Sequence, residues 1–455
     1  MKYEVKWIMA KIVVKEVEEG LEEGVQEGVG KSVEKDPDKG QKGKGSSLVA
    51  KEILDRVGYG FGSQQFVNIL FFLTGASFLV IGLVNGARVV LSTLSSFLIQ
   101  RYSKVNGIGK KFIGMSGILF GFSFLLIGAA IFLRSVALFS IAVLLGSISI
   151  VPYGEFYQKL VKERDRIYYK KLASYGLIVT ALSLFIAAYI MDMFPITGTP
   201  VEFTILGKAL SFRIYGYIIA FEATALSFIL AGYILSFIGI REEKTSKVNF
   251  LENLSAFSEL VKQKASYFLK NKVILTIIIA GVLTSIIQTI GNSYYGIFVY
   301  TEFTDVGFGG FLNVAMVFLI AVFSSILGSM ISKMNSKSYG KFPTLFFGTA
   351  LMGVMPLSYY YNPSLVTVTI GTILGVIGAA MVGVANGLLT LELIREKERG
   401  LYFSLYGVCI VISYIILIPI LAYFTQLFGL SSLFLLLALM LVVVAFLYII
   451  AARAS

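Results

Sequence analysis

Two short rows of polar side chains interrupt long apolar segments of this sequence. The longer row places its members at i, i+3, i+7 and i+10, on one face of a helix: Ser285, Gln288, Asn292 and Tyr295. Gln64 and Asn68, four residues apart, share a helix face in the same way. Carboxamides donate and accept hydrogen bonds without carrying charge, so such rows suit binding of neutral or zwitterionic solutes. The alternative interpretation is hydrogen bonding between helices.

Three ionisable residues also lie inside apolar segments: Arg88, Glu155 and Glu222. Charges are costly in such surroundings, which makes all three residues candidates for ion coupling, with the two glutamates as the candidate proton carriers. Glu155 follows Pro152, where a helix can bend. The alternative is structural pairing, of Glu222 with Arg88 or the backbone, and of Glu155 with Lys159.

Several kinds of chemistry have no residues to support them. The sequence contains no histidine, and Cys409 is its only cysteine, so we expect no metal site and no disulfide. Neither paired carboxylates within apolar segments nor a nucleophile constellation is present, and no segment fits G-x-x-x-x-G-K-[ST]. The sequence therefore predicts neither an enzyme nor an ATP-driven pump, and no cofactor.

The elements that position these residues are expected to be membrane helices. Hydrophobic residues make up 56% of the 455 residues and charged residues only 15%, with mean hydropathy +0.82. This apolar content exceeds what one water-soluble core buries, so the lipid bilayer is the predicted partner. The net charge of +12 does not indicate nucleic acid, because the basic residues lie between the apolar segments.

About twelve apolar segments are long enough to cross a bilayer as helices. Their approximate cores are 61–82, 84–100, 112–133, 135–157, 172–193, 214–240, 273–299, 307–331, 342–361, 364–391, 401–427 and 431–451. Asn85 and Gly86 are taken to mark the turn between the first two. Residues 1–48 are rich in Lys, Glu and Gly, and we assign 1–56 to a partly flexible cytoplasmic extension.

Basic residues alternate between successive loops, as expected when one set of loops is cytoplasmic. The basic set includes Arg101, Lys104, Lys110, Lys111, Lys159, Lys162, Arg164, Arg166, Lys170, Lys171, Lys333, Lys337, Lys341, Arg395, Lys397 and Arg399. The other set carries only Arg134, Lys208 and Arg213. This pattern predicts a plasma-membrane protein with both termini cytoplasmic, a bundle at 57–240, a cytoplasmic loop at 241–272 and a second bundle at 273–455. Phe203 to Phe212 is predicted to form an external hairpin or cap.

The two bundles show an internal repeat. SSFLIQRYSKVN from Ser95 matches SSILGSMISKMN from Ser324, and KERDR from Lys162 matches REKER from Arg395. The Q-x-x-x-N motif of Gln64 and Asn68 recurs at Gln288 and Asn292. These ordered matches indicate a duplicated six-helix unit in parallel orientation.

With these features, residues 50 to 455 resemble the major facilitator superfamily. In that family the loop after the second helix often reads G-x-x-x-D-R-x-G-R-R; here Arg101, Gly109, Lys110 and Lys111 fit, while Ser96 and Gln100 replace Gly and Asp. ELIREKERG from Glu392 resembles the family's E-x-x-P-x-x-x-R-G pattern, with Arg395 at the proline position.

The resemblance implies an all-α polytopic fold with two pseudo-symmetric six-helix bundles around a central cavity. The cavity would be lined by the first and fourth helices of each half, which assigns the two polar rows and Asn386 to substrate binding. Basic residues at the helix ends become candidates for a cytoplasmic gate, or for contacts with anionic headgroups: Arg101, Lys110, Lys111, Arg166, Lys333 and Arg399.

The function that follows is secondary active transport of a small solute by alternating access, in a monomer, with a proton or cation as the candidate coupling ion. Two alternatives stay open. One is a proton-coupled exporter of lipophilic compounds, and the other is a membrane scaffold or lipid-binding protein that transports nothing.

Overall fold

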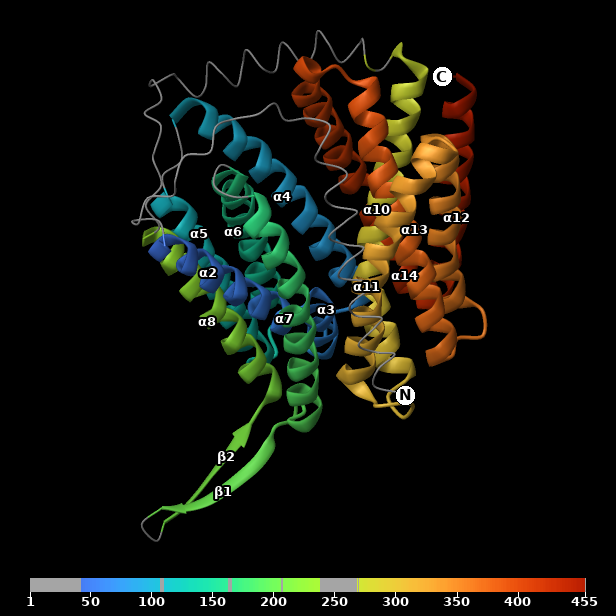
Figure 1. The fold of residues 1–455 in the computed structure, drawn as a ribbon. Coiled ribbons are helices and arrows are strands. Elements are labelled where there is room, and N and C mark those ends of the chain that lie inside the picture. Colours follow the sequence, from blue (N-terminus) through green and yellow to red (C-terminus); the bar gives the residue numbers. More distant parts are fainter. Residues whose placement is uncertain are drawn as a thin grey trace, which may run out of the picture. The chain divides into compact units, whose positions relative to one another are not determined.

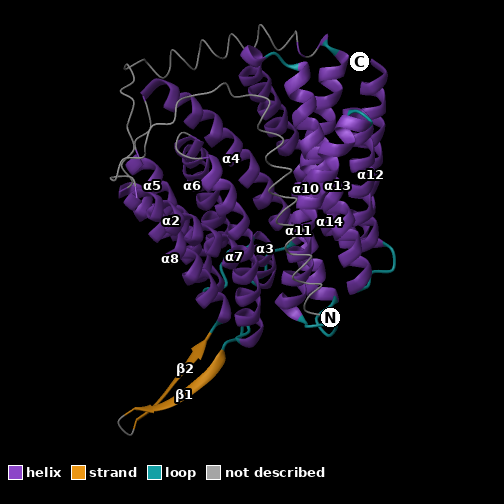
Figure 2. Ribbon diagram, viewed as in Figure 1, coloured by secondary structure: helices purple, strands orange, loops and turns teal. Residues whose placement is uncertain are grey.

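The computed structural model describes residues 42–106, 110–162, 166–205, 208–237, 268 and 270–454. These residues form long helices and one antiparallel hairpin (Figures 1 and 2). The first half contains α2 (Lys42–Phe61), α3 (Gln64–Leu73), α4 (Phe78–Asn106), α5 (Lys110–Phe132), α6 (Val136–Lys162), α7 (Arg166–Met193), β1 (Thr199–Ile205), β2 (Lys208–Ile214) and α8 (Gly216–Phe237). The second half contains α10 (Lys272–Glu302), α11 (Gly310–Ser338), α12 (Lys341–Tyr360), α13 (Leu365–Leu393) and α14 (Glu396–Ala454).

The described helices account for twelve membrane crossings. Ten of the described helices are long and apolar enough to span a bilayer, and one of these, α14, is long enough to cross it twice. The longest, α14, is broken at Gly429, where φ is 80°. Its two parts run back along each other, since Tyr448 lies within electrostatic range of Tyr406. The pair α2 and α3, interrupted at Gly62 and Ser63, supplies the remaining crossing. The all-helical membrane fold that the sequence predicted is confirmed.

The boundary between the first two crossings differs from the prediction. The chain turns between Thr74 and Ser77, with Gly75 at φ +104°, whereas Asn85 and Gly86 lie inside α4. Gly86 is needed for packing, because a Cβ there would lie 2.5 Å from Cγ2 of Ile418 in α14. Asn85 and Gly86 are residue types typical of turns, but here they lie within a helix and allow contacts between helices.

The first crossing also begins earlier than its apolar core suggests. Residues 42–56, which the sequence analysis placed in the extension, belong to α2. Lys51 pairs with Asp55 and Arg56 pairs with Glu52, so this part of the helix is charged and the apolar pattern alone does not reveal it. Residues 1–41 lie outside the described residues.

The helices pack closely within each half. In the first half, α5 packs against α6 and α8, and the rings of Phe120, Phe124 and Phe228 contact one another. In the second half, α13 packs against α11 and α12, while α14 packs against α10 and α12. These contacts join helices within a half, as the repeat predicts.

We call the two ends of the helical bundle the basic end and the hairpin end. The basic end holds the helix termini at Asn106, Lys110, Lys162, Arg166, Ser338, Lys341, Leu393 and Glu396. The hairpin end holds the turn after α3, the break at Gly429, and strands β1 and β2. The strands pair antiparallel with Phe203 opposite Leu210, which confirms the predicted hairpin and lengthens it. The predicted loop 241–272 lies almost entirely outside the described residues.

The described helices of the two halves meet mainly through four pairs: α4 with α14, α4 with α10, α3 with α10, and α7 with α11. Several hydrogen bonds between the halves lie toward the hairpin end. Tyr294 donates its hydroxyl proton to the Phe78 carbonyl at 2.7 Å, and the Leu79 N–H donates to Gln426 Oε1 at 3.3 Å. These bonds join the start of α4 to α10 and α14 across the interface between the halves.

Candidate functional site

Four amide residues form a connected group where the halves meet. Asn68 Nδ2 in α3 donates to the Asn292 carbonyl of α10 at 3.1 Å, across the interface. Asn85 Nδ2 donates to Asn68 Oδ1 at 3.1 Å, and Gln64 Nε2 lies 3.5 Å from Asn85 Oδ1. We call Gln64, Asn68, Asn85 and Asn292 the amide cluster. It contains Asn68 and Asn292, which occupy equivalent positions of the internal repeat.

Close backbone approach makes these contacts possible. The Gly296 N–H donates to Gln65 Oε1 at 3.2 Å, and a Cβ on Gly296 would lie 2.5 Å from that oxygen. A residue larger than glycine would therefore displace the Gln65 side chain and disrupt this hydrogen bond between α3 and α10. Gln65 was not among the predicted site residues, and Asn85 was predicted to mark a turn.

The face of α10 that carries the amides is not fully covered. Asn68 and Asn85 are buried, whereas the side chains of Asn292 and Gln288 are exposed. Gln288 lies about one turn from Asn292 toward the basic end. This face meets the other half at Asn292, so Gln288 extends the exposed polar surface of α10 from the interface toward the basic end. Both side chains therefore present polar atoms at the surface of the described structure.

Two members of the predicted substrate row serve packing within the second half. The Ser285 hydroxyl lies 2.9 Å from the hydroxyl of Tyr414, which is buried in α14. Tyr295 is buried against Tyr359 and Phe434, at ring-centroid distances of 4.6 and 5.2 Å. These contacts fix the rotation of α10 and so orient its amide face.

Asn386 lies on α13 and is half-buried. Its side-chain oxygen is buried and has no hydrogen-bond partner within the described part of the chain. An unpaired buried acceptor costs free energy, so a donor from a bound solute or water would be stabilised at this position.

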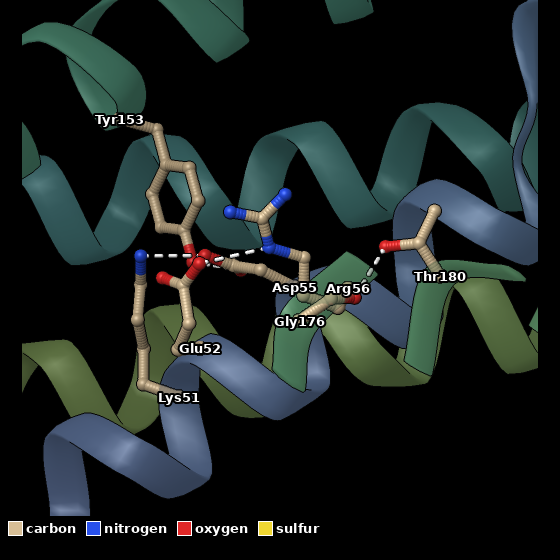
Figure 3. A network of polar contacts seen from close by, with 7 residues as sticks. All are labelled: Lys51, Glu52, Asp55, Arg56, Tyr153, Gly176 and Thr180. Carbon is tan, nitrogen blue, oxygen red and sulfur yellow. Dashed lines mark hydrogen bonds and ion pairs between the residues drawn. The ribbon is translucent and has the colours of Figure 1, made fainter. Parts of the chain in front are cut away.

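A group of charged residues lies inside the first half, on α2 (Figure 3). Lys51 Nζ lies 2.5 Å from Asp55 Oδ2, and the Tyr153 hydroxyl of α6 donates to Asp55 Oδ1 at 2.5 Å. Lys51 Nζ also lies 4.6 Å from the centre of the Tyr153 ring, within range of a cation–π interaction. The Lys51 side chain is 0% exposed and that of Asp55 is 7% exposed. An ion pair this well buried is stable only because each charge has its partner.

A second ion pair extends the group toward α7. Arg56 Nε donates to Glu52 Oε1 at 2.9 Å. The Arg56 side chain passes over Gly176, where a Cβ would lie 2.8 Å from Arg56 Nε (Figure 3). We call Lys51, Glu52, Asp55, Arg56 and Tyr153 the charge cluster. The cluster contains two acidic and two basic side chains, so its formal charges cancel.

The three ionisable residues chosen from the sequence do not come together. Glu222 is exposed on α8, and Arg88 is half-buried on α4. No ion pair joins Arg88 to Glu222 in the described structure. Glu155 lies on α6, two residues after Tyr153, but its side chain is outside the described residues.

The predicted gate residues are distributed along the basic end. Lys111 and Lys333 are exposed. Arg399 donates to the carbonyls of Leu391 at 3.0 Å and Ile394 at 3.2 Å, which caps the last turn of α13 within its own half. The side chains of Arg101, Lys110 and Arg166 lie outside the described residues.

The charge cluster was missed because its residues precede the first apolar core. A signal was present nonetheless: KEILDR, from Lys51 to Arg56, places acids and bases four residues apart directly before the apolar run. Charges with i,i+4 partners can enter a bundle at lower cost than isolated charges.

No family model matches this sequence, and no curated protein matches it. The fold is nevertheless similar to those of solved transporters. The nucleoside transporter NupG matches with a TM-score of 0.65 at 10% identity, over 90% of this chain and 99% of that chain.

Two further structures give similar results. A bacterial homologue of the iron transporter ferroportin, in an inward-facing state, matches with a TM-score of 0.62 at 12% identity, over 90% of this chain and 98% of that chain. A D-xylose–proton symporter matches with a TM-score of 0.60 at 13% identity, over 89% and 96% of the two chains. The chain therefore has the same fold as these transporters, in agreement with the fold that the sequence resemblance predicted.

Proposed function

We propose that this protein is a secondary active transporter that moves a small polar solute across the membrane by alternating access. One observation carries the proposal: α10 presents the exposed amides of Gln288 and Asn292 on the face that meets the other half at the amide cluster. A solute bound there would contact both halves, and rocking of the halves would expose it to either side in turn. NupG and the D-xylose–proton symporter, which have a similar fold, transport polar solutes.

The proposed binding residues are those whose polar atoms lie open to this interface or lack a partner. Gln288, Asn292 and Asn386 would contact the solute directly. Gln64 and Asn68 would hold the interface at the correct spacing and exchange hydrogen bonds with the solute when the halves move. Ser285 and Tyr295 would act indirectly, because their contacts orient α10.

The charge cluster is the proposed coupling element. Protonation of Asp55 would neutralise the partner of Lys51 and weaken the bond from Tyr153, and so loosen α2 from α6. Glu155 is close in sequence and is a second candidate, whereas the exposed Glu222 and half-buried Arg88 have no described contact with this cluster. A proton is the proposed coupling ion.

We further propose a monomer in the plasma membrane, with the basic end facing the cytoplasm, as the distribution of Lys and Arg indicates. Arg101, Lys110, Lys111, Arg166 and Lys333 would then lie at the cytoplasmic surface, where they would contact each other's helix ends or anionic lipid headgroups.

Purified protein in proteoliposomes provides the test. A panel of nucleosides, sugars, amino acids and lipophilic dyes is assayed with and without an imposed pH gradient. The proposal expects saturable movement of at least one polar solute and a dependence on the gradient. Movement of the dyes alone would favour a lipophilic exporter, and no movement of any compound would favour a scaffold.

A further inference from the structure

A carboxylate of the first half binds the start of a helix in the second half. Asp192 lies in the last turn of α7, at the hairpin end. Its Oδ1 accepts a hydrogen bond from the Phe311 N–H and its Oδ2 one from the Leu312 N–H, both at 2.8 Å. Both donors belong to the first turn of α11. We call this group of two bonds the Asp192 latch.

The latch supplies the cap that α11 lacks locally. The N-cap residue is Gly309, which offers no side chain to accept from the first backbone N–H groups. A carboxylate at a helix N-terminus accepts charge-assisted hydrogen bonds and also interacts favourably with the helix dipole. Because this carboxylate belongs to the other half, the capping energy of α11 becomes binding energy between the halves.

The first residue of α11, Gly310, leaves room for Asp192. Gly310 has a φ of +42°, and a Cβ at this position would overlap the Asp192 carboxylate. Glycine at position 310 is therefore a condition for the latch, independent of Asp192 itself.

The latch lies beside a cavity of about 330 Å³ at the hairpin end. The cavity is lined by Asp192 together with aromatic residues from both halves, including Tyr217, Tyr300 and Phe308. Asp192 is only half-buried. Water can therefore hydrate the carboxylate and the two N–H groups when they separate, which lowers the cost of opening compared with a fully buried pair.

We propose that the Asp192 latch is the gate that holds the hairpin end closed, and that its release lets the two halves separate there. This rests on the proposed function, because alternating access requires the hairpin end to open. The latch joins α7 to α11, whereas the amide cluster joins α3 and α4 to α10, so the gate is distinct from the proposed solute site.

Distance measurements between spin labels test the latch without any transport assay. Leu133→Cys and Tyr361→Cys, at two highly exposed positions of opposite halves at the hairpin end, are labelled in a Cys409→Ser background. With Asp192→Ala added, the ratio of molecules with a long label distance to those with a short one should rise about tenfold or more. This is the change expected when about 1.4 kcal/mol of hydrogen bonding is lost.

Two further variants separate gating from misfolding. Gly310→Ala should shift the distances in the same direction, since its Cβ would displace the carboxylate. Asp305→Asn is the matched control: this carboxyl group is exposed at the same end, and its loss should leave the distances as in the parent. Unchanged distances in both Asp192→Ala and Gly310→Ala would overturn the gate.

Stability and flux measurements complete the design. A gate predicts that Asp192→Ala and Gly310→Ala remain folded by thermal unfolding in detergent. Equal shifts in the Asp305→Asn control would also refute it, because the effect would then follow from loss of any acidic group at this end. If the distances shift as expected but no solute moves in proteoliposomes, the gate stands and the transport proposal fails.

Discussion

Individual amides in this protein have different surroundings, and these predict different consequences of substitution. Asn68 is buried and bonded on both sides, to Asn85 and to the Asn292 carbonyl. Gln288 and the side chain of Asn292 are exposed. Removal of a buried, bonded amide leaves its partners unsatisfied, while removal of an exposed one does not.

Asn292→Ala and Gln288→Ala are therefore expected to weaken solute binding about tenfold each, with little change in unfolding temperature. The Asn292 carbonyl, which accepts from Asn68, is retained in the alanine variant. Asn68→Ala should instead cost about 1–3 kcal/mol of stability. Binding of the transported solute and thermal unfolding, measured on the same preparations, check this. Equal affinities in wild type and both exposed-site variants would assign these amides to packing.

The charge cluster leads to a second prediction about individual residues. Lys51→Met leaves a carboxylate buried without its main partner and should destabilise the protein by about 3–5 kcal/mol. Adding Asp55→Asn removes that charge, so the double variant should recover most of the loss. Thermal unfolding in detergent measures both, and Lys111→Met is the control because Lys111 is exposed. A double variant as unstable as Lys51→Met would show that the two charges are not coupled.

The sequence indicated the importance of some of these residues but not their roles. Periodicity and the repeat identified Asn68 and Asn292, which touch across the interface, because equivalent positions meet near a pseudo-twofold axis. The same periodicity grouped Ser285 and Tyr295 with them. A helical spacing reports a shared face, whereas neighbours from other helices decide which residues on that face are covered.

Among the elements, α4 and α14 make a long contact between the halves that depends on small residues. Gly82 and Gly86 allow this approach, since a Cβ at Gly82 would lie 2.6 Å from Cβ of Ala422 and one at Gly86 would lie 2.5 Å from Cγ2 of Ile418. Small residues let membrane helices pack closely and also slide. This contact is a candidate surface for the rocking motion.

Gly86→Ala should push α4 away from α14 and lower stability by about 1–3 kcal/mol, as overpacking does in tight cores. Gly383→Ala, at a position where a Cβ would meet no atom within 4 Å, should have little effect. Unfolding temperature and transport rate are measured for both. Similar behaviour of the two variants would mean that the contact tolerates expansion.

Element boundaries were the least predictable feature of the fold. The run of apolar residues on either side of Thr74 to Ser77 has almost no polar break, so the turn was placed too late, at Asn85 and Gly86. In α2, paired charges concealed a helix because apolar content was the guide. Ion pairing and close helix contacts are tertiary features, and hydropathy does not report them.

At the scale of the whole molecule, the count of twelve crossings and the division into two halves follow from length, hydropathy and the repeat. These properties are set by the bilayer, which leaves no alternative to helices for long apolar segments. The sequence therefore predicts the architecture well even though the identity to solved transporters is only 10–13%. The solute is not predicted, because it depends on a few side chains at the interface.

The orientation of the molecule in the membrane is testable with single cysteines in a Cys409→Ser background. A membrane-impermeant maleimide should label Tyr361→Cys, at the hairpin end, on intact cells. It should label Lys337→Cys, at the basic end, only after the cells are permeabilised. Labelling of both positions on intact cells, or the opposite order, would contradict the proposed orientation.

The central claim is that a solute binds between the halves and is carried across the membrane. The most direct measurement compares uptake by wild type and by the combined Gln288→Ala and Asn292→Ala variant in proteoliposomes with matched protein content. We predict saturable uptake of a polar solute by wild type and a loss of at least about tenfold in the variant at low solute concentration. Uptake that is equal in the two, or that does not exceed protein-free liposomes for any solute, would contradict the account.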